Sequence, residues 1–275
     1  MQGSRIVVTG FGAITSLGQG VTALWEGLRA GRRGIGPLRR FDVEGCRCRL
    51  AAEAPDPVLP EGRRPLRPLF TTRSARLALV AAHEALSQSG LEAEILRDTA
   101  LILGSAGAGD AVLGQYLAAR GARPVSAWRA LAYGKHAMTA AVAESLGVGG
   151  PLHTVNTACS SGVVALALGM DLLAAGAVRA VLAGGADELT PYTFSGFSSL
   201  RAVDPEPCRP FDLARRGMTL GEGAGVLVLE RESDAKARGA RVLARLAGVG
   251  HCCDAGHLTA PDEDGDGEVT GVATV

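Results

Sequence analysis

The sequence has little lysine and no excess of charge of either sign. Only Lys135 and Lys236 are lysine among 28 basic residues, and 28 acidic residues balance the total. A chain without net charge has no global field that attracts nucleic acid or an anionic membrane surface, so we expect neither as a partner. The shortage of lysine fits a GC-rich genome better than it fits a function.

Long uninterrupted apolar runs are also missing. The apolar stretches contain Gly, Asp or Arg and are shorter than a membrane span requires. The N-terminal MQGSRIVVTGFG lacks the charged region, apolar core and cleavage site of a secretory signal. We therefore expect a cytoplasmic protein whose six cysteines are reduced thiols. A chain of 275 residues with 47% hydrophobic and 20% charged residues is long enough for a sizeable globular core.

What the sequence does contain is an alternation of strand-like and helix-like segments. We expect strands at 5–9, 100–105, 153–158, 180–187 and 223–230, a strand-like segment at 241–250, and helices at 21–30, 72–89, 136–146 and 160–175. The strands are continuous apolar runs, which is typical of a sheet buried on both faces. The pattern predicts an α/β layered fold, with a five-stranded, mostly parallel or mixed sheet between helices. Residues 31–70, rich in Arg, Pro and Gly, are expected to form an irregular excursion of the same domain.

Cys159 lies where the third expected strand runs into the helix at 160–175. The N–H groups of a first helical turn are unpaired, and there they would stabilise a thiolate and hold an oxyanion. Its neighbours are all small, as a nucleophile turn requires: Ala158, Ser160, Ser161 and Gly162. Two interpretations stay open, a reactive nucleophile and a buried small hydrophobe. A helix dipole activates a thiol only in part, so a nucleophile would also need a histidine or a similar partner.

The helix after Cys159 is almost wholly apolar. Between Gly162 and Ala175 its only charged residue is Asp171. A helix that is apolar all round is buried all round, and one sheet covers only one side of it. We therefore expect a second element to cover the other side.

The segment TACSSG around Cys159 resembles the β-ketoacyl-acyl-carrier-protein synthases, the condensing enzymes of fatty-acid and polyketide synthesis, which have the thiolase fold. Further segments agree in order: VVTGFGAITSLGQG at the start, then AGGADE, RPFDLARRGMTLGEGAGVLVLE and DAGHLTAPDEDG. The resemblance covers nearly the whole chain and favours the elongating branch over degradative thiolases and over the branch primed by coenzyme A esters. One departure is Arg216, where family members often carry an acid.

The resemblance implies a 3-oxoacyl-acyl-carrier-protein synthase that performs a decarboxylative Claisen condensation. Cys159 matches the acyl-accepting nucleophile, and its own N–H matches one of two oxyanion donors. The substrates would arrive on the phosphopantetheine of an acyl-carrier protein, with no cofactor and no metal. The implied partners are that carrier and a second synthase subunit in a homodimer or heterodimer. Acyl chain length, and the choice between fatty acid and polyketide, stay open.

The resemblance also implies a second, similar half that this sequence lacks. Family members continue into HGTGT-like and GH-containing motifs with two histidines, a lysine and a Gly-Phe-Gly-Gly loop, none of which occurs here. The five histidines match no catalytic position: His83, His136, His153, His251 and His257. We predict a synthase N-terminal domain at 1–252 and the start of a linker to the second half at 253–275.

Two alternatives to the condensing enzyme remain. The chain is a truncated or split half-synthase that serves as a non-catalytic or partner-dependent interaction subunit, or it is a thiolase-like enzyme acting on coenzyme A esters. The first would not catalyse condensation alone. The second would be acylated by coenzyme A esters but not by carrier-bound ones.

Other candidate sites are weaker. The Gly-rich segments do not form G-x-G-x-x-G at a helix start, which argues against dinucleotide binding. DEDGDGEVTGVA, from Asp262, begins like an EF-hand loop but has Ala273 at the twelfth position. Cys252 and Cys253 lack zinc spacing relative to the nearby histidines, and the cysteines of the 31–70 excursion, Cys46 and Cys48, are expected to be incidental. Glu222 is expected to order a loop rather than to act on the site electrostatically.

Overall fold

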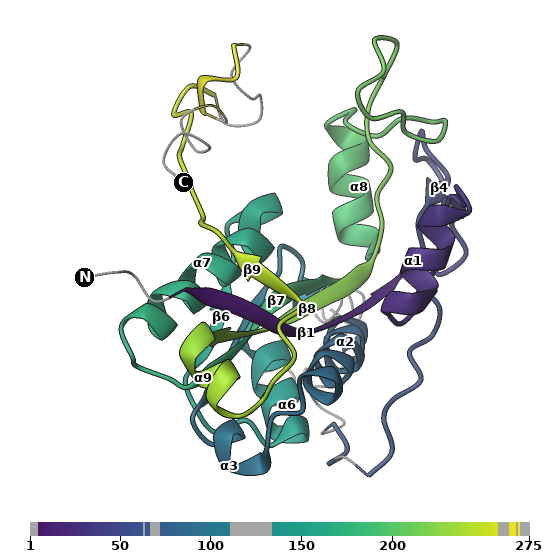
Figure 1. Ribbon diagram of the computed structural model, residues 1–275. Helices are drawn as coiled ribbons and strands as arrows, with labels where there is room; N and C mark the ends of the chain where they lie inside the picture. Colours follow the sequence, from purple (N-terminus) through teal and green to yellow (C-terminus); the bar gives the residue numbers. More distant parts are fainter. Residues whose placement is uncertain are drawn as a thin grey trace.

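One mixed sheet runs through the molecule, with helices on both of its faces (Figure 1). The computed structural model describes residues 5–62, 64–66, 72–110, 134–257, 264–267 and 269. The strands of this sheet are β1 (Ile6–Thr15), β2 (Gly18–Gln19), β5 (Thr99–Gly104), β6 (Leu152–Val155), β7 (Ala180–Asp187), β8 (Gly223–Arg231) and β9 (Ala244–Leu246). Their order is β2-β1-β8-β7-β5-β6, and β9 pairs with β1.

The helices are α1 (Val21–Arg29), α2 (Arg73–Ser89), α3 (Ala93–Leu96), α6 (His136–Leu146), α7 (Ser161–Ala174), α8 (Pro191–Ser199) and α9 (Glu232–Ala237). The long α2 begins at Thr72, whose side chain accepts the N–H of Ala75, and ends at Gly90 in the left-handed conformation. These end signals lie in the sequence, because an N-cap threonine and a C-cap glycine satisfy backbone groups that the helix leaves open. The helices predicted at 72–89, 136–146 and 160–175 are confirmed.

The sheet is mixed, as the prediction allowed, but among the described residues it has seven strands rather than five. β5 pairs parallel with β6 and β7, while β8 pairs antiparallel with both β7 and β1. Continuous apolar runs mark burial on both faces and do not distinguish parallel from antiparallel pairing. Two of the differences concern short strands: β2, which was not predicted, has two residues, and β9 covers only Ala244–Leu246 of the predicted 241–250.

β1 is twice as long as the predicted 5–9. The prediction stopped early because the glycines in the second half of the strand interrupt the apolar pattern in the sequence. A Cβ on Gly10 would clash with the carbonyl oxygen of Ala85, and one on Gly12 with that of Ala81. Helix α2 therefore packs directly against the backbone of β1. Glycine is required here by close approach rather than by a turn.

Helix α7 lies on one face of the sheet, opposite α2 and α6 (Figure 1). Its buried residues form a single stripe at every fourth position: Ser161, Ala165, Gly169 and Leu173. Val163, on another side, is 55% exposed. An apolar hollow of about 520 Å³ runs beside α7 over the sheet and is bordered by Phe11, Leu166 and Leu227. The expectation that one sheet covers only one side of this helix is confirmed.

The excursion at 31–70 packs onto the main body through its own small core. It contains the two-residue strands β3 (Gly36–Pro37) and β4 (Leu50–Ala51). Phe41 meets Phe194 of α8 edge to face, with ring centroids 6.0 Å apart. Cys48 is fully buried in the same cluster, which gives this cysteine a packing role. Helix α8 was not predicted, although Thr190 followed by Pro191 is a helix-start signal.

No helix in the described part of the chain is long and apolar enough to span a bilayer. Within the same residues, no group of three His, Cys, Asp or Glu side chains is placed to hold a metal ion. Most of the EF-hand-like segment that starts at Asp262 lies outside the described residues.

Candidate active site

Cys159 sits in a tight turn between β6 and α7, where the sequence placed it. A single turn of 3-10 helix, Ala158–Ser160, makes this connection, and Ala158 has a φ of 53°. A left-handed φ at a residue other than glycine is strained, and such residues cluster at functional sites. The Oγ of Ser161 holds the turn by accepting the N–H of Thr157 at 3.0 Å and donating to the carbonyl of Ala158 at 2.6 Å.

The side chain of Cys159 is exposed at the start of α7. No side chain caps this helix at Ser160. The amide groups of a first helical turn carry partial positive charge and favour an anion nearby. The geometry therefore supports an accessible thiol rather than a buried small hydrophobe.

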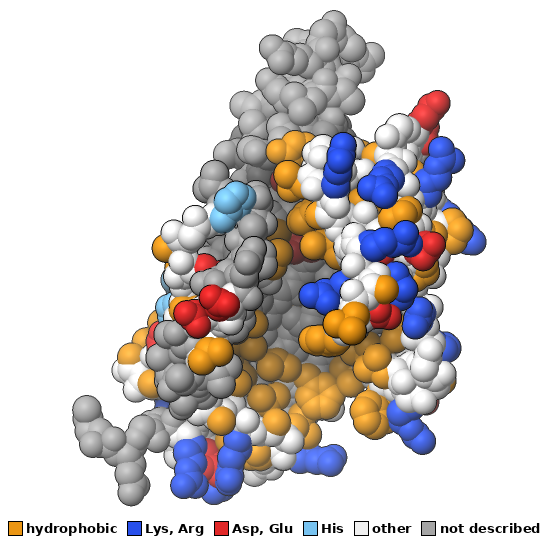
Figure 2. All heavy atoms as spheres, turned by 90° about the horizontal axis from the view of Figure 1, so that it is seen from above, with side chains coloured by type: hydrophobic (Ala, Val, Ile, Leu, Met, Phe, Trp, Pro, Cys, Tyr) orange, Lys and Arg blue, Asp and Glu red, His pale blue; other side chains and the backbone are white. Residues whose placement is uncertain are grey.

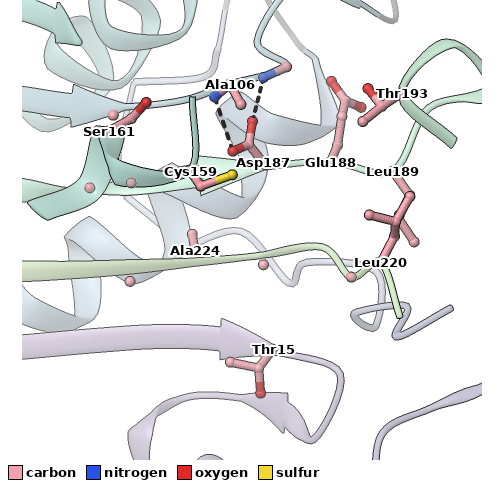
Figure 3. A pocket seen from close by; sticks show the side chains of 18 of the residues that line it. Thr15, Ala106, Cys159, Ser161, Asp187, Glu188, Leu189, Thr193, Leu220 and Ala224 are labelled. Carbon is pink, nitrogen blue, oxygen red and sulfur yellow. Dashed lines mark hydrogen bonds between the residues drawn. The ribbon is translucent and has the colours of Figure 1, made fainter. Parts of the chain in front are cut away.

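A cavity of about 560 Å³ opens beside Cys159 (Figure 3). Seen from above, hydrophobic side chains line a hollow next to the side of the molecule where Lys and Arg gather (Figure 2). The cavity wall near the sulfur consists largely of glycine and alanine, which leaves room for a ligand: Gly104, Ala106, Gly107, Gly162 and Gly185.

Asp187, at the end of β7, organises one wall of this cavity. Its carboxylate accepts hydrogen bonds from the Ser105 hydroxyl at 2.6 Å, the Gly107 N–H at 2.8 Å and the Ala106 N–H at 3.2 Å. Figure 3 shows the carboxylate of Asp187 beneath the backbone of this loop. The carboxylate thus accepts the loop N–H groups that would otherwise bond to backbone carbonyls in a strand or helix.

Glu188, the next residue, is a buried carboxyl in the same wall. The Ser74 hydroxyl, at the start of α2, lies 3.2 Å from one of its oxygens. Burial raises the pKa of Glu188, the hydrogen bonds from Ser74 lower it, and the negative charge of Glu222 raises it further. The net shift is upward, so folding favours the protonated form of this acid.

Glu188→Gln is expected to raise the free energy of unfolding at neutral pH. An acid whose pKa is higher in the folded state destabilises the fold once the pH rises above its unfolded value, here 4.5. Glutamine removes that cost, so the gain should be present at neutral pH and vanish well below pH 4.5. Urea unfolding of both proteins at the two pH values measures this. An equal gain at both would contradict the assignment.

Glu222 is the centre of a buried ion cluster behind the cavity. Its side chain is fully buried and accepts hydrogen bonds from both Arg40 and Arg73. It also accepts the backbone N–H groups of Ala54 at 3.1 Å and Leu189 at 3.2 Å. These contacts join the excursion, the start of α2 and the loop after β7, so Glu222 orders loops, as the sequence analysis favoured.

The remaining candidates lie away from this cavity. The five histidines all belong to the described part of the chain, and none lines the cavity. Arg216 contacts Glu206 at 2.9 Å, which accounts for its local ion pairing. Sequence reasoning missed Asp187, Glu188 and Thr193 as cavity residues. The signal was present for the two acids, because polar residues directly after a continuous apolar strand lie at the end of a buried strand.

Comparison with known proteins agrees with this geometry. The family model described as the N-terminal domain of β-ketoacyl synthases matches residues 3–235. The chain belongs to the β-ketoacyl synthase family. It is 38% identical over 264 residues to nodulation protein E of Rhizobium meliloti (strain 1021), covering 94% of this chain and 65% of that protein.

Two further relatives describe the same relationship. The 3-oxoacyl-[acyl-carrier-protein] synthase 2 of Synechocystis is 33% identical, over 99% of this chain and 68% of its own. The solved ishigamide ketosynthase/chain length factor superposes with a TM-score of 0.90 at 36% identity, over 99% of this chain and 69% of its own. This synthase-family chain therefore spans about two thirds of the length of the relatives it matches, and the predicted layered fold is confirmed.

Proposed function

We propose that this chain carries the acyl-accepting half of a 3-oxoacyl-acyl-carrier-protein synthase, with Cys159 as the nucleophile. The observation that supports this most is an exposed thiol at an uncapped helix start, beside a cavity walled by small residues. Family membership adds to it. A hydrolase that uses paired carboxylates or a metal ion would need acidic or metal-binding side chains at the position of Cys159.

In the proposed reaction the Cys159 thiolate attacks the carbonyl carbon of an acyl thioester carried on phosphopantetheine. The tetrahedral intermediate collapses, the pantetheine sulfur leaves and takes up a proton, and the acyl group becomes a thioester on Sγ. A malonyl group on a second carrier then loses CO₂, and the resulting carbanion attacks the acyl carbonyl. Cys159 leaves as the thiolate, and the product is a 3-oxoacyl carrier. The N–H of Cys159 would hold the oxyanion in both steps.

We propose an acyl-carrier protein as a partner. The phosphopantetheine that it carries is anionic, so a basic surface on this chain would attract it. Residues 29–49 contain seven arginines and two acidic residues. Six of these arginines are exposed and lie outside the ion cluster of Glu222: Arg29, Arg32, Arg33, Arg39, Arg47 and Arg49. A local basic surface attracts an anionic partner even when net charge is zero. The absence of a described membrane-spanning helix is compatible with a cytoplasmic location, which we also propose.

A second candidate function is a partner-dependent subunit, and the open side of α7 favours it. The unburied residues of this helix are uncharged apart from Asp171, and Val163 and Leu166 among them line the neighbouring apolar hollow. Contiguous apolar surfaces of this kind mark interaction sites. We propose that the segment corresponding to the remaining third of the relatives covers it, on this polypeptide or on another. The pairing in the ishigamide ketosynthase/chain length factor supports a second synthase subunit as a further partner.

The test is a condensation assay with the purified 275-residue chain, acylated carrier and malonyl carrier, with and without a polypeptide that supplies the remaining third. We expect the chain alone to self-associate, and 3-oxoacyl carrier to form only when the second polypeptide is present. Absence of product in both mixtures would contradict the synthase function. A monodisperse, active monomer of this chain alone would contradict the proposed cover over α7.

A further inference from the structure

The loop at 105–108 contributes to one wall of the cavity beside Cys159 and is held by a clamp of two charged residues, Asp187 and Lys135. Asp187 takes the hydrogen-bond donors of the loop, as described above. Lys135 contacts two carbonyl groups of the loop. Its Nζ donates to the Ala106 carbonyl at 2.8 Å and lies 3.5 Å from the Ala108 carbonyl. Lys135 is one of only two lysines in the chain.

Hydrogen bonds shape the middle of this loop, where Ala106 and Gly107 lie. The Ser105 hydroxyl accepts the N–H of Ala108 at 2.8 Å while it donates to Asp187. Gly107 contributes no side chain, and the place where its Cβ would stand is surrounded by oxygens of Asp110, Asp187 and Thr193, 3.4 to 3.6 Å away. The ends of the loop are anchored, because the Ser105 N–H donates to the Val155 carbonyl at 3.0 Å and Ala108 is buried in the main core. Between them, Ala106 and Gly107 are held by hydrogen bonds from outside the loop.

The surroundings of these contacts are partly shielded from water. Burial raises the pKa of Asp110, which the nearby Lys135 charge and the Thr193 hydroxyl only partly offset. Hydrogen bonds to charged groups are stronger in such places than on an open surface. Loss of Asp187 would leave the part-buried Ser105 hydroxyl and Gly107 N–H without their acceptor. Loss of Lys135 would leave the exposed Ala106 carbonyl to water, without a fixed partner.

We propose that Asp187 and Lys135 are positioning residues that hold the 105–108 loop away from the cavity, and so determine which acyl tails fit beside Cys159. They act on the space that receives the tail and leave the thiol itself unchanged. This inference rests on the proposed function, because it takes the cavity as the acyl site. It predicts selectivity against long chains, rather than general inactivity, when the clamp is weakened.

Alkylation of Cys159 tests this without carrier or condensation. Iodoacetamide and an N-octyl iodoacetamide both react by displacement of iodide by Sγ, and peptide mapping reports the rate at Cys159 alone. The small reagent measures the reactivity of the thiol, whereas the octyl reagent also measures the room beside it. In Asp187→Asn one carboxylate oxygen becomes an NH₂ group that faces N–H or O–H donors. We expect the octyl-to-small rate ratio to fall about tenfold.

Lys135→Met removes the other charged partner of the same loop and should also lower the ratio. It also keeps the test valid if Asp187→Asn fails to fold, which a thermal unfolding curve of each variant reports. Asp171→Asn is the matched control, because Asp171 is an exposed acid at the far end of α7, and its ratio should equal that of the unmodified protein.

An unchanged ratio in both folded clamp variants would overturn the proposal. Equal slowing of both reagents would also overturn it, since the loop would then act on the thiol and not on the tail. Failure of the synthase function has a different signature: carrier thioesters would not acylate Cys159, while the alkylation ratios would still respond to the clamp.

Discussion

Replacing Cys159 by alanine is expected to abolish transfer of an acyl group from a carrier thioester to this protein. The methyl group of alanine cannot attack a carbonyl, and no other cysteine lines the cavity among the described residues. Covalent catalysis depends entirely on its nucleophile. Intact-mass measurement after incubation with acylated carrier should show an adduct on the unmodified protein and none on the variant.

Cys252→Ala is the matched control for this experiment. Cys252 is also exposed, but it lies in the C-terminal segment and its Sγ donates to the carbonyl of Gly267. The acyl adduct should form on this variant in full yield. An adduct of equal yield on Cys159→Ala would show that another group accepts the acyl chain.

Glu222→Gln is expected to destabilise the fold by about 3–5 kcal/mol, the typical cost of breaking a buried ion pair from one side. Glutamine keeps the size of the side chain but removes its charge from between Arg40 and Arg73. Its NH₂ group would also face an arginine or a backbone N–H where an acceptor is required. Guanidinium chloride unfolding of both proteins measures the difference.

Asp56→Asn provides the comparison, because Asp56 contacts the same two arginines from the solvent side. It lies 3.2 Å from Arg40 and 2.9 Å from Arg73, and its side chain is 77% exposed. Ion pairs in water contribute little to stability, so this variant should unfold nearly where the unmodified protein does. Equal destabilisation by the two substitutions would mean that burial of Glu222 is not what makes it important.

The sequence predicted those parts of the fold that have a period or an end signal. Thr72 and Gly90 mark α2, and the apolar helix after Cys159 was found with nearly correct ends. Strand direction was not predictable, since β8 and β5 are similar apolar runs on either side of β7 but pair with it in opposite directions. Direction depends on how the chain returns to the sheet, which local composition does not encode.

For the site, too, local features could be predicted from the sequence, whereas contacts between distant parts of the chain could not. The position of Cys159 at a strand-to-helix turn could be predicted, because its small neighbours and the helix that follows are local features. The contacts within the cavity wall could not be predicted, although the two acids at the end of β7 carried a local signal. Asp187 meets a loop some 80 positions earlier in the chain, and Glu222 meets Arg40 from 182 positions away. Contacts of this kind exist only once the sheet has assembled.

The site at which an acyl group attaches to the chain decides whether Cys159 is the nucleophile. The unmodified chain is incubated with acylated carrier, digested with protease under mildly acidic conditions that preserve thioesters, and its peptides are analysed by mass spectrometry. The account predicts the acyl mass on the peptide that contains Cys159 and on none of the peptides with the other five cysteines. Acylation at Cys252 or Cys253 with Cys159 unmodified would contradict it.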